Sequence, residues 1–153
     1  MSDSLTPAEF AAAGHEVVDW IARYLREVDK YPVLSRVAPG DVRAQLPASP
    51  PATGATWGEI FADFEQYVMP GITHWNHPGF FAYFANTGSA SGILAELLTA
   101  GLNVNAMLWK TSPAATELEQ LTLDWLRQLV GLRQSWFGII TDTASISSML
   151  AIA

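Results

Sequence analysis

Residues 74–84 combine the residue types that could form a small-molecule site. The segment holds two histidines and a run of aromatic side chains, namely Trp75, Phe80, Phe81, Tyr83 and Phe84. Small polar residues follow, and Glu96 is the only formal charge between residues 74 and 109. An apolar segment with a few hydrogen-bonding groups is typical of a pocket for a flat small molecule. The alternative for the same aromatic cluster is ordinary core packing.

The histidines and the nearest lysine have simpler interpretations. His74 and His77 are spaced like metal ligands on a helix, but Pro78 follows them and no third ligand lies close in the sequence. Two ligands do not make a zinc site, so we expect no metal and two hydrogen-bonded structural histidines. Lys110 interrupts an apolar run and is expected to reach the surface. The sequence contains no Ser/His/Asp set, P-loop, CxxC or GxGxxG motif.

A second candidate site is the turn at residues 139–147, where an apolar stretch runs into a Thr-Asp-Thr-Ala-Ser sequence and a helical pattern begins. Backbone N–H groups and small hydroxyls at the N-terminus of a helix bind anions such as phosphate. Thr143, Ser145, Ser147 and Ser148 each carry a hydroxyl for such a site. The alternative is that Thr143 or Ser145 only caps the helix.

Composition limits the class of protein. The 153 residues suffice for one domain, and half of them are hydrophobic, which argues against a disordered chain. The net charge of −7 argues against a nucleic-acid surface. The absence of cysteine excludes disulfides and Cys-based zinc sites and fits a reducing, cytoplasmic location. We expect no signal peptide, because the start Met-Ser-Asp-Ser is polar, and no membrane span, because no stretch has the roughly 20 apolar residues that a span needs.

Two amphipathic helices joined by a connector are predicted before the aromatic segment. Thr6 and Glu9 form a capping box, and apolar residues then recur at helical spacing for about six turns. The proline-rich residues 31–53 predict an extended connector with at most a short helix, at residues 40–46. Thr56 and Glu59 form a second capping box, which begins a shorter helix. Pro70 and Gly71 end this helix.

Three helices and a strand are predicted after the aromatic segment. One helix is expected to start at residue 88 or 89 and to end before its C-cap, Gly101. Another follows the N-cap Ser112 and closes at Gly131. Residues 137–140 are expected to form a short strand that leads into the turn and a final helix. The pattern of that helix runs to the last residue with no stop signal, so we expect a piece of a longer chain.

Three motifs occur in the order found in a known family. Residues 74–84 read His-Trp-Asn-His-Pro-Gly-Phe-Phe-Ala-Tyr-Phe, residues 109–119 read Trp-Lys-Thr-Ser-Pro-Ala-Ala-Thr-Glu-Leu-Glu, and residues 143–145 read Thr-Ala-Ser. These segments resemble the signatures of group II pyridoxal-phosphate decarboxylases, and the aromatic L-amino acid decarboxylases are the most similar members. The N-terminal helix and the proline-rich connector also match in order and length, so the resemblance covers nearly the whole chain.

The resemblance implies a role for each matched position. Thr143, Ala144 and Ser145 would hold the phosphate of pyridoxal 5'-phosphate (PLP). The substrate pocket would be lined by Trp75, Tyr83, Phe84, Asn86, Asn105 and Met107. Relatives often have Thr at the position of Asn86 and Pro at that of Ala85, which leaves the preference for a ring hydroxyl open. Asn105 and Met107 fall on the segment that, in the family, reaches into the active site of the partner subunit.

The resemblance also places the reactive groups outside this chain. The family's Schiff-base lysine, its pyridinium-pairing aspartate and its ring-stacking histidine would lie beyond residue 153, and neither Lys30 nor Lys110 matches the lysine motif. No catalytic residue is therefore expected here. The implied fold is the α/β aspartate-aminotransferase type (fold type I). Residues 1–108 would be an N-terminal helical arm that wraps a partner subunit, and residues 109–153 would start the large PLP-binding domain.

The implied function is PLP-dependent decarboxylation of an aromatic L-amino acid to the amine and CO2 by a full-length homodimer. Two alternatives lie within the same family: a decarboxylase of another amino acid and an aromatic aldehyde synthase. A third alternative is a non-catalytic dimerisation fragment. The expected partners are an amino-acid substrate and a second copy of the chain, with no nucleic acid and no membrane.

Overall fold

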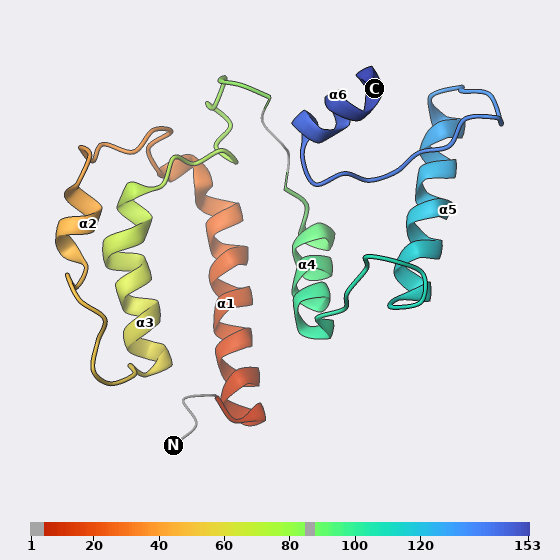
Figure 1. Ribbon diagram of the computed structural model, residues 1–153. Helices are drawn as coiled ribbons and strands as arrows, with labels where there is room; N and C mark the ends of the chain where they lie inside the picture. The colour runs from red at the N-terminus through yellow and green to blue at the C-terminus, as the bar shows by residue number, and fades with distance from the viewer. Residues whose placement is uncertain (1–4, 85–87) are drawn as a thin grey trace. The chain divides into compact units, whose positions relative to one another are not determined.

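The computed structural model describes residues 5–84 and 88–153, which form helices and connecting segments with no β-strand among them. The chain divides into two compact units, Met1–Ser89 and Ala90–Ala153 (Figure 1). No helix in the described ranges is long and apolar enough to cross a membrane.

The first helix, α1, spans Pro7–Glu27 and begins at the predicted capping box. The Thr6 side chain accepts a hydrogen bond from the backbone of Glu9, and the Glu9 carboxylate accepts one from the backbone N–H of Thr6 at 2.8 Å. This exchange satisfies two of the N–H groups that a helix start otherwise leaves unpaired. A short 3-10 turn, η1 (Val28–Lys30), ends the helical segment.

The connector and the second helical rod also follow the sequence prediction. The connector contains one short helix, α2 (Asp41–Gln45), which begins after Gly40 in the left-handed region, at φ 100°. The rod consists of three helical pieces in succession, α3 (Trp57–Asp63), the π-helical η2 (Phe64–Val68) and the 3-10 turn η3 (Met69–Gly71). Pro at the start of η3 limits further helix, because it cannot donate a backbone hydrogen bond.

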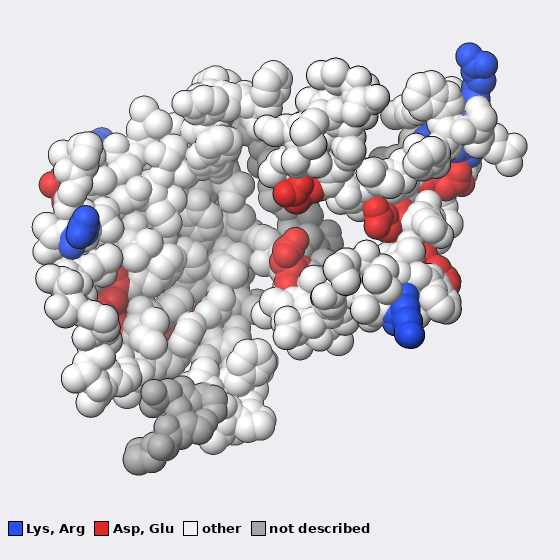
Figure 2. All heavy atoms as spheres, viewed as in Figure 1, with Lys and Arg blue, Asp and Glu red and all other residues white. Residues whose placement is uncertain are grey.

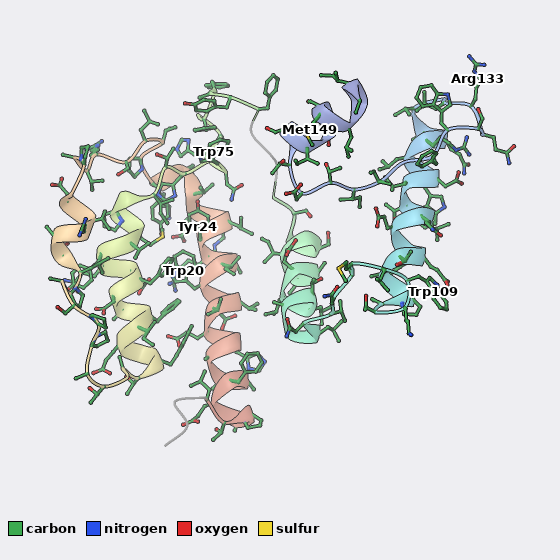
Figure 3. All side chains as sticks on the ribbon, viewed as in Figure 1. Trp20, Tyr24, Trp75, Trp109, Arg133 and Met149 are labelled. Carbon is green, nitrogen blue, oxygen red and sulfur yellow. The ribbon has the colours of Figure 1, made fainter. Side chains whose placement is uncertain are left out.

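In the first unit α1 and α3 run side by side in the same direction (Figure 1). Two indole N–H groups join them to carboxylates, Trp20 to Glu65 at 2.7 Å and Trp57 to Glu16 at 2.9 Å. Trp20 and Tyr24 project from α1 toward the α3 rod (Figure 3). Trp20 meets Phe64 edge-on, with ring centroids 5.2 Å apart. Aromatic contacts and charge-assisted hydrogen bonds therefore hold the two helices together.

The second unit contains α4 (Ala90–Leu102), α5 (Pro113–Leu129) and α6 (Ala144–Ile152). The predicted N-cap of α5 is confirmed, because the Ser112 hydroxyl accepts a bond from the backbone N–H of Ala115. Gly131 closes this helix at φ 73°, also as predicted.

Two sequence predictions for the second unit are wrong. Gly101 is not the C-cap of α4, because the helix continues through Leu102 and Asn103 takes the left-handed conformation at φ 47°. Asparagine is the residue other than glycine that most readily adopts this geometry. Residues 137–140 are not a strand, because a strand needs a neighbour to pair with and the described residues offer none. The α/β prediction is therefore not met within the described residues, which are helical.

Both units leave large apolar side chains exposed. The described buried residues are Ala13, Val28, Met69, His74 and Ser112. By contrast, Phe10 on α1 is 61% exposed, Leu98 on α4 is 68% exposed and Leu129 on α5 is 81% exposed. In Figure 2 most of the visible face of the first unit carries no charged side chain. Apolar faces of this extent are typical of interaction surfaces.

Candidate functional site

The aromatic segment after η3 forms a small stack of rings. The Trp75 indole stacks on Phe80, with ring centroids 4.8 Å apart, and on Tyr83, with centroids 5.7 Å apart and an interplanar angle of 9°. We call these three residues the aromatic platform. Trp75 is 46% exposed and Tyr83 is 85% exposed, so the platform offers ring surface to a ligand. The structure thus brings two of the predicted pocket residues, Trp75 and Tyr83, into direct contact.

Tyr83 has an unusual backbone conformation. Its φ is 56°, in the left-handed region that a bulky side chain rarely adopts. Such a conformation costs about 1–3 kcal/mol and persists only where surrounding contacts enforce it. Stacking on Trp75 is the contact that the structure supplies. Phe84, the third predicted aromatic pocket residue, is 98% exposed, and Asn86 lies outside the described residues.

His74 anchors the platform to α1. It is the most buried residue described, at 2% exposed, and its Nδ1 shares a 2.9 Å hydrogen bond with the Tyr24 hydroxyl. The Tyr31 ring packs against the imidazole, with centroids 4.7 Å apart. Burial, and then the neighbouring His77, lower the pKa of His74, and burial followed by the Tyr31 hydroxyl raises the pKa of Tyr24. Both groups are therefore neutral near pH 7, and the residue before Trp75 is fixed in place.

His77 also has a structural role. Its Nδ1 accepts a 2.8 Å hydrogen bond from the backbone N–H of Gly79, and its Nε2 lies 3.3 Å from the carbonyl oxygen of Asp29. Because a backbone N–H only donates and a carbonyl only accepts, the proton of this ring sits on Nε2. Both histidines are hydrogen-bonded structural groups, as the sequence indicated. No cluster of three or more His, Asp or Glu in residues 5–84 and 88–153 could hold a metal ion.

The turn before α6 presents hydrogen-bond donors at the start of a helix. Thr143 is the N-cap, and its hydroxyl oxygen accepts a bond from the backbone N–H of Ile146 at 3.3 Å. The N–H groups of Ala144 and Ser145 lie in the first turn, where no intrahelical acceptor exists. Ser145 is exposed, and its hydroxyl makes no hydrogen bond within the described residues. Two N–H groups and one O–H group thus remain available to an anion.

The other hydroxyls near this turn are engaged. Thr141 donates to the carbonyl oxygen of Thr143 at 3.1 Å and shares a hydrogen bond with the Ser147 hydroxyl. Ser148 donates to the carbonyl oxygen of Ala144 at 2.9 Å, within the helix. Ser147 and Ser148, two hydroxyls that the sequence offered for an anion, are therefore used to shape the turn.

The remaining predicted pocket residues lie together in the loop after α4. The Asn105 side chain accepts a 2.9 Å bond from the backbone N–H of Met107, and the Met107 side chain is 75% exposed. Asn105 thus shapes the loop and Met107 is presented outward. Lys110, in the same loop, is exposed as predicted. The Trp109 indole donates to Glu117 at 3.0 Å, which links the first and last parts of the second motif.

Comparison with known proteins assigns the family. The sequence profile described as "Pyridoxal-dependent decarboxylase conserved domain" matches residues 39–153. The chain belongs to the pyridoxal-dependent decarboxylase family. That match includes the platform, the second motif and the turn at Thr143, so all three motifs lie in the conserved domain of the family.

Relatives of known function are similar along most of the chain. Phenylacetaldehyde synthase of a Rosa hybrid cultivar is 45% identical over 136 residues, which is 89% of this chain and 27% of the relative. Tryptophan decarboxylase of Catharanthus roseus, solved in complex with L-tryptophan, superposes with a TM-score of 0.92 at 38% identity. That alignment covers 99% of this chain and 34% of the solved one.

A tryptophan decarboxylase structure from Oryza sativa, solved with PLP and tryptamine, has a TM-score of 0.84 at 37% identity and covers 93% of this chain and 30% of that one. The chain spans about a quarter of the length of the curated relatives it matches. The activities named for these relatives are therefore those of longer polypeptides.

The sequence did not identify several residues that support the candidate site. Tyr24 and Tyr31 surround His74, although no motif in the sequence singles them out. Glu119 accepts a 2.7 Å bond from the backbone N–H of Ile140, just before the turn at Thr143. The second motif ends at Glu119, which draws attention to this residue, but the motif does not indicate which group its side chain binds. The partners became visible only when segments distant in sequence were placed side by side.

Proposed function

We propose that the full-length protein containing this chain is a PLP-dependent decarboxylase that converts an aromatic L-amino acid to its amine and CO2. The observation that supports this most is the turn at Thr143, Ala144 and Ser145. It lies in the conserved domain of the family, and its donors remain unused in the structure. The aromatic platform supplies ring surface suited to a flat side chain.

The turn fits the phosphate group of PLP. A phosphate is an anion with several acceptor oxygens, and the N-terminus of α6 offers the N–H groups of Ala144 and Ser145 together with the Ser145 hydroxyl. The helix dipole adds to the attraction. Asp142 is the one carboxylate immediately before the cap, and its exposed position lets it point into solvent.

PLP, when bound, acts as an electron sink for the bond that breaks at the amino-acid α-carbon. The residues of this chain would contribute binding and orientation. Thr143, Ala144 and Ser145 would fix the phosphate end of the cofactor. Trp75, Tyr83, Phe84 and Asn86, with Asn105 and Met107, would hold the substrate side chain and exclude water from it. The lysine that attaches the cofactor would come from the rest of the polypeptide.

We also propose a homodimer of fold type I, in which residues 1–108 form the helical arm and residues 109–153 start the large domain. The exposed apolar side chains of α1 support this, since Phe10 is 61% exposed and Val18 is 40% exposed. Obligate dimer interfaces are apolar, like a domain core cut in half. Helix α5, within residues 109–153, exposes apolar side chains such as Leu118 and Leu129, which suits a helix that packs against the remainder of a large domain.

A second candidate, an aromatic aldehyde synthase, is supported by relatives of that activity, among them a phenylacetaldehyde synthase at 45% identity and a solved 4-hydroxyphenylacetaldehyde synthase at 39% identity. Both enzymes would use the same phosphate turn and the same aromatic platform. The products distinguish them, because the decarboxylase releases an amine whereas the synthase releases an aldehyde.

The decisive experiment uses the purified full-length protein. PLP is added, the visible absorption spectrum is recorded, and borohydride is used to attach the cofactor covalently before peptide mapping. We expect attachment to a lysine outside residues 1–153. A panel of aromatic and aliphatic amino acids is then assayed for amine, CO2 and aldehyde. Absence of PLP binding, or equal rates with all amino acids, would contradict the proposal. Aldehyde as the main product would favour the second candidate.

A further inference from the structure

Glu119 links α5 to the segment that leads into the phosphate turn. Its carboxylate accepts a hydrogen bond from the backbone N–H of Ile140 over 2.7 Å, and the two residues are 21 positions apart in the sequence. Glu119 is half-buried, and Gly138 on the same segment lies against Leu123 on α5, so close that a Cβ at Gly138 would be 3.4 Å from the leucine side chain. The segment therefore crosses α5 in direct contact.

The Ile140 N–H has no backbone partner in the described residues, since residues 137–140 do not pair as a strand. The Glu119 carboxylate supplies an acceptor for this N–H, and hydrogen bonds to a charged acceptor are short. The short distance agrees with such a charge-assisted bond. The Glu119 side chain thus supplies the hydrogen-bond acceptor that a neighbouring strand would supply in a β-sheet.

The bond lies one residue from the network that shapes the turn. Thr141, directly after Ile140, donates to the carbonyl oxygen of Thr143 and contacts the Ser147 hydroxyl. Thr143 in turn caps α6 through the backbone N–H of Ile146. A continuous path of hydrogen bonds and chain therefore runs from α5 through Ile140 to the helix start. Movement of Ile140 would shift the donors that face the phosphate.

We infer that Glu119 is a positioning residue for the cofactor phosphate, acting through the backbone of Ile140. This inference rests on the proposed function, because it takes the turn at Thr143 to bind PLP. Glu119 does not itself bind the phosphate, since a carboxylate would repel it. Its contribution is geometric, so an uncharged acceptor of the same length replaces it and a shortened acid does not.

Four variants of the full-length protein separate this mechanism from others. Glu119→Ala removes the acceptor, Glu119→Gln keeps an acceptor oxygen without the charge, and Glu119→Asp keeps the charge but withdraws the oxygen by one methylene. Glu117→Ala is the matched control, because Glu117 lies on the same helix and also accepts one hydrogen bond, from Trp109 rather than from the turn segment. Apo-protein is prepared for each, and circular dichroism checks that it is folded.

The readouts are the equilibrium Kd for PLP and the hydrogen-exchange rate of the Ile140 amide in the apo-protein. We expect Glu119→Ala and Glu119→Asp to raise the Kd about five- to tenfold, the effect of losing one ordinary hydrogen bond, and to accelerate exchange at Ile140. Glu119→Gln and Glu117→Ala should stay within about twofold of the wild type, too small a change for a lost bond. If Glu119→Ala does not fold, the comparison of the Kd values of Glu119→Asp and Glu119→Gln still tests the inference.

Two results would overturn the inference. Equal Kd values for Glu119→Asp and wild type would show that the tether does not affect the phosphate turn. A Kd for Glu119→Gln raised as much as that for Glu119→Ala would show that the charge of the acceptor matters, and not only its position. Failure of the wild-type protein to bind PLP is a different outcome, because it contradicts the proposed function. The exchange rate of the Ile140 amide would still show whether Glu119 holds Ile140 in place.

Discussion

The Tyr24 hydroxyl and Nδ1 of His74 share a 2.9 Å hydrogen bond that joins α1 to the aromatic segment across 50 positions of sequence. This bond connects two parts of the first unit that serve different purposes. Tyr24 stacks on Trp20 in the contact between α1 and α3, whereas His74 directly precedes Trp75 in the platform. The position of the platform therefore depends on the helix packing beneath it.

Replacement of Tyr24 by Phe should destabilise the first unit. The ring contacts remain, but the buried nitrogen of His74 loses its partner, which costs about 1–3 kcal/mol. Urea unfolding of the full-length protein, followed by tryptophan fluorescence, measures the change, and exchange of the His74 amide locates it. Tyr31→Phe is the matched control, because the Tyr31 hydroxyl makes no hydrogen bond in the described residues while its ring also packs on His74. Equal stability of the two variants would show that the Tyr24 hydroxyl contributes nothing.

The stability of the first unit should depend on pH through His74. Burial lowers the pKa of His74 in the folded protein below that of the unfolded chain, which is about 6.5. As the pH falls through the unfolded value, the unfolded chain takes up the proton first, so the free energy of unfolding decreases. The full contribution is present above that value and is lost as the pH falls through the lower folded pKa.

Unfolding curves at a series of pH values from neutral to mildly acidic measure this slope. In His74→Gln the slope due to this residue should disappear. The exposed His15 on α1 provides the matched substitution, and His15→Gln should retain the slope. A profile that His74→Gln leaves unaltered would show that another group causes the pH dependence.

Local chemistry made most of the helices predictable. Thr6 with Glu9, Thr56 with Glu59 and the N-cap Ser112 are short-range signals, and each helix begins where its signal predicts. The end of α4 was misplaced because Gly101 and Asn103 are both able to terminate a helix, and the choice depends on where the following loop must go. Residues 137–140 carry strand-like residues, but pairing is a property of a neighbour that the sequence pattern does not reveal.

The candidate site was only partly predictable for the same reason. The first motif predicts that Trp75 and Tyr83 belong to one site. It does not predict that their rings stack or that Tyr83 has a left-handed φ. Glu119 lay in a motif without an assigned partner, and its bond to Ile140 spans a helix and a loop. Contacts between distant segments depend on packing, which short-range patterns do not encode.

Ser145→Ala should weaken retention of PLP by the full-length protein. The variant removes one of the three donors available at the start of α6, and a hydrogen bond to a charged phosphate contributes about 1–3 kcal/mol. Ser148→Ala is the matched control on the same helix, because the Ser148 hydroxyl is already bonded to the carbonyl oxygen of Ala144. Equilibrium dialysis of PLP against each apo-protein gives the Kd. If the two variants bind PLP equally well, Ser145 does not contact the phosphate.

The platform leads to a prediction about substrate selectivity. Trp75 contributes ring area to the pocket that we propose for an aromatic side chain, and it also supports Tyr83 in its left-handed conformation. Trp75→Ala should lower kcat/KM for an aromatic amino acid about five- to tenfold, the effect expected from losing an aromatic contact. Trp75→Phe keeps a ring at the position and should recover most of that loss. The measurement is the ratio of kcat/KM between an aromatic and an aliphatic amino acid, because a general loss of fold lowers both values and leaves their ratio unchanged. An unchanged ratio in Trp75→Ala would place the substrate side chain elsewhere, and an equal fall of the ratio in Trp75→Phe would mean that the indole itself, and not its ring area, makes the selective contact.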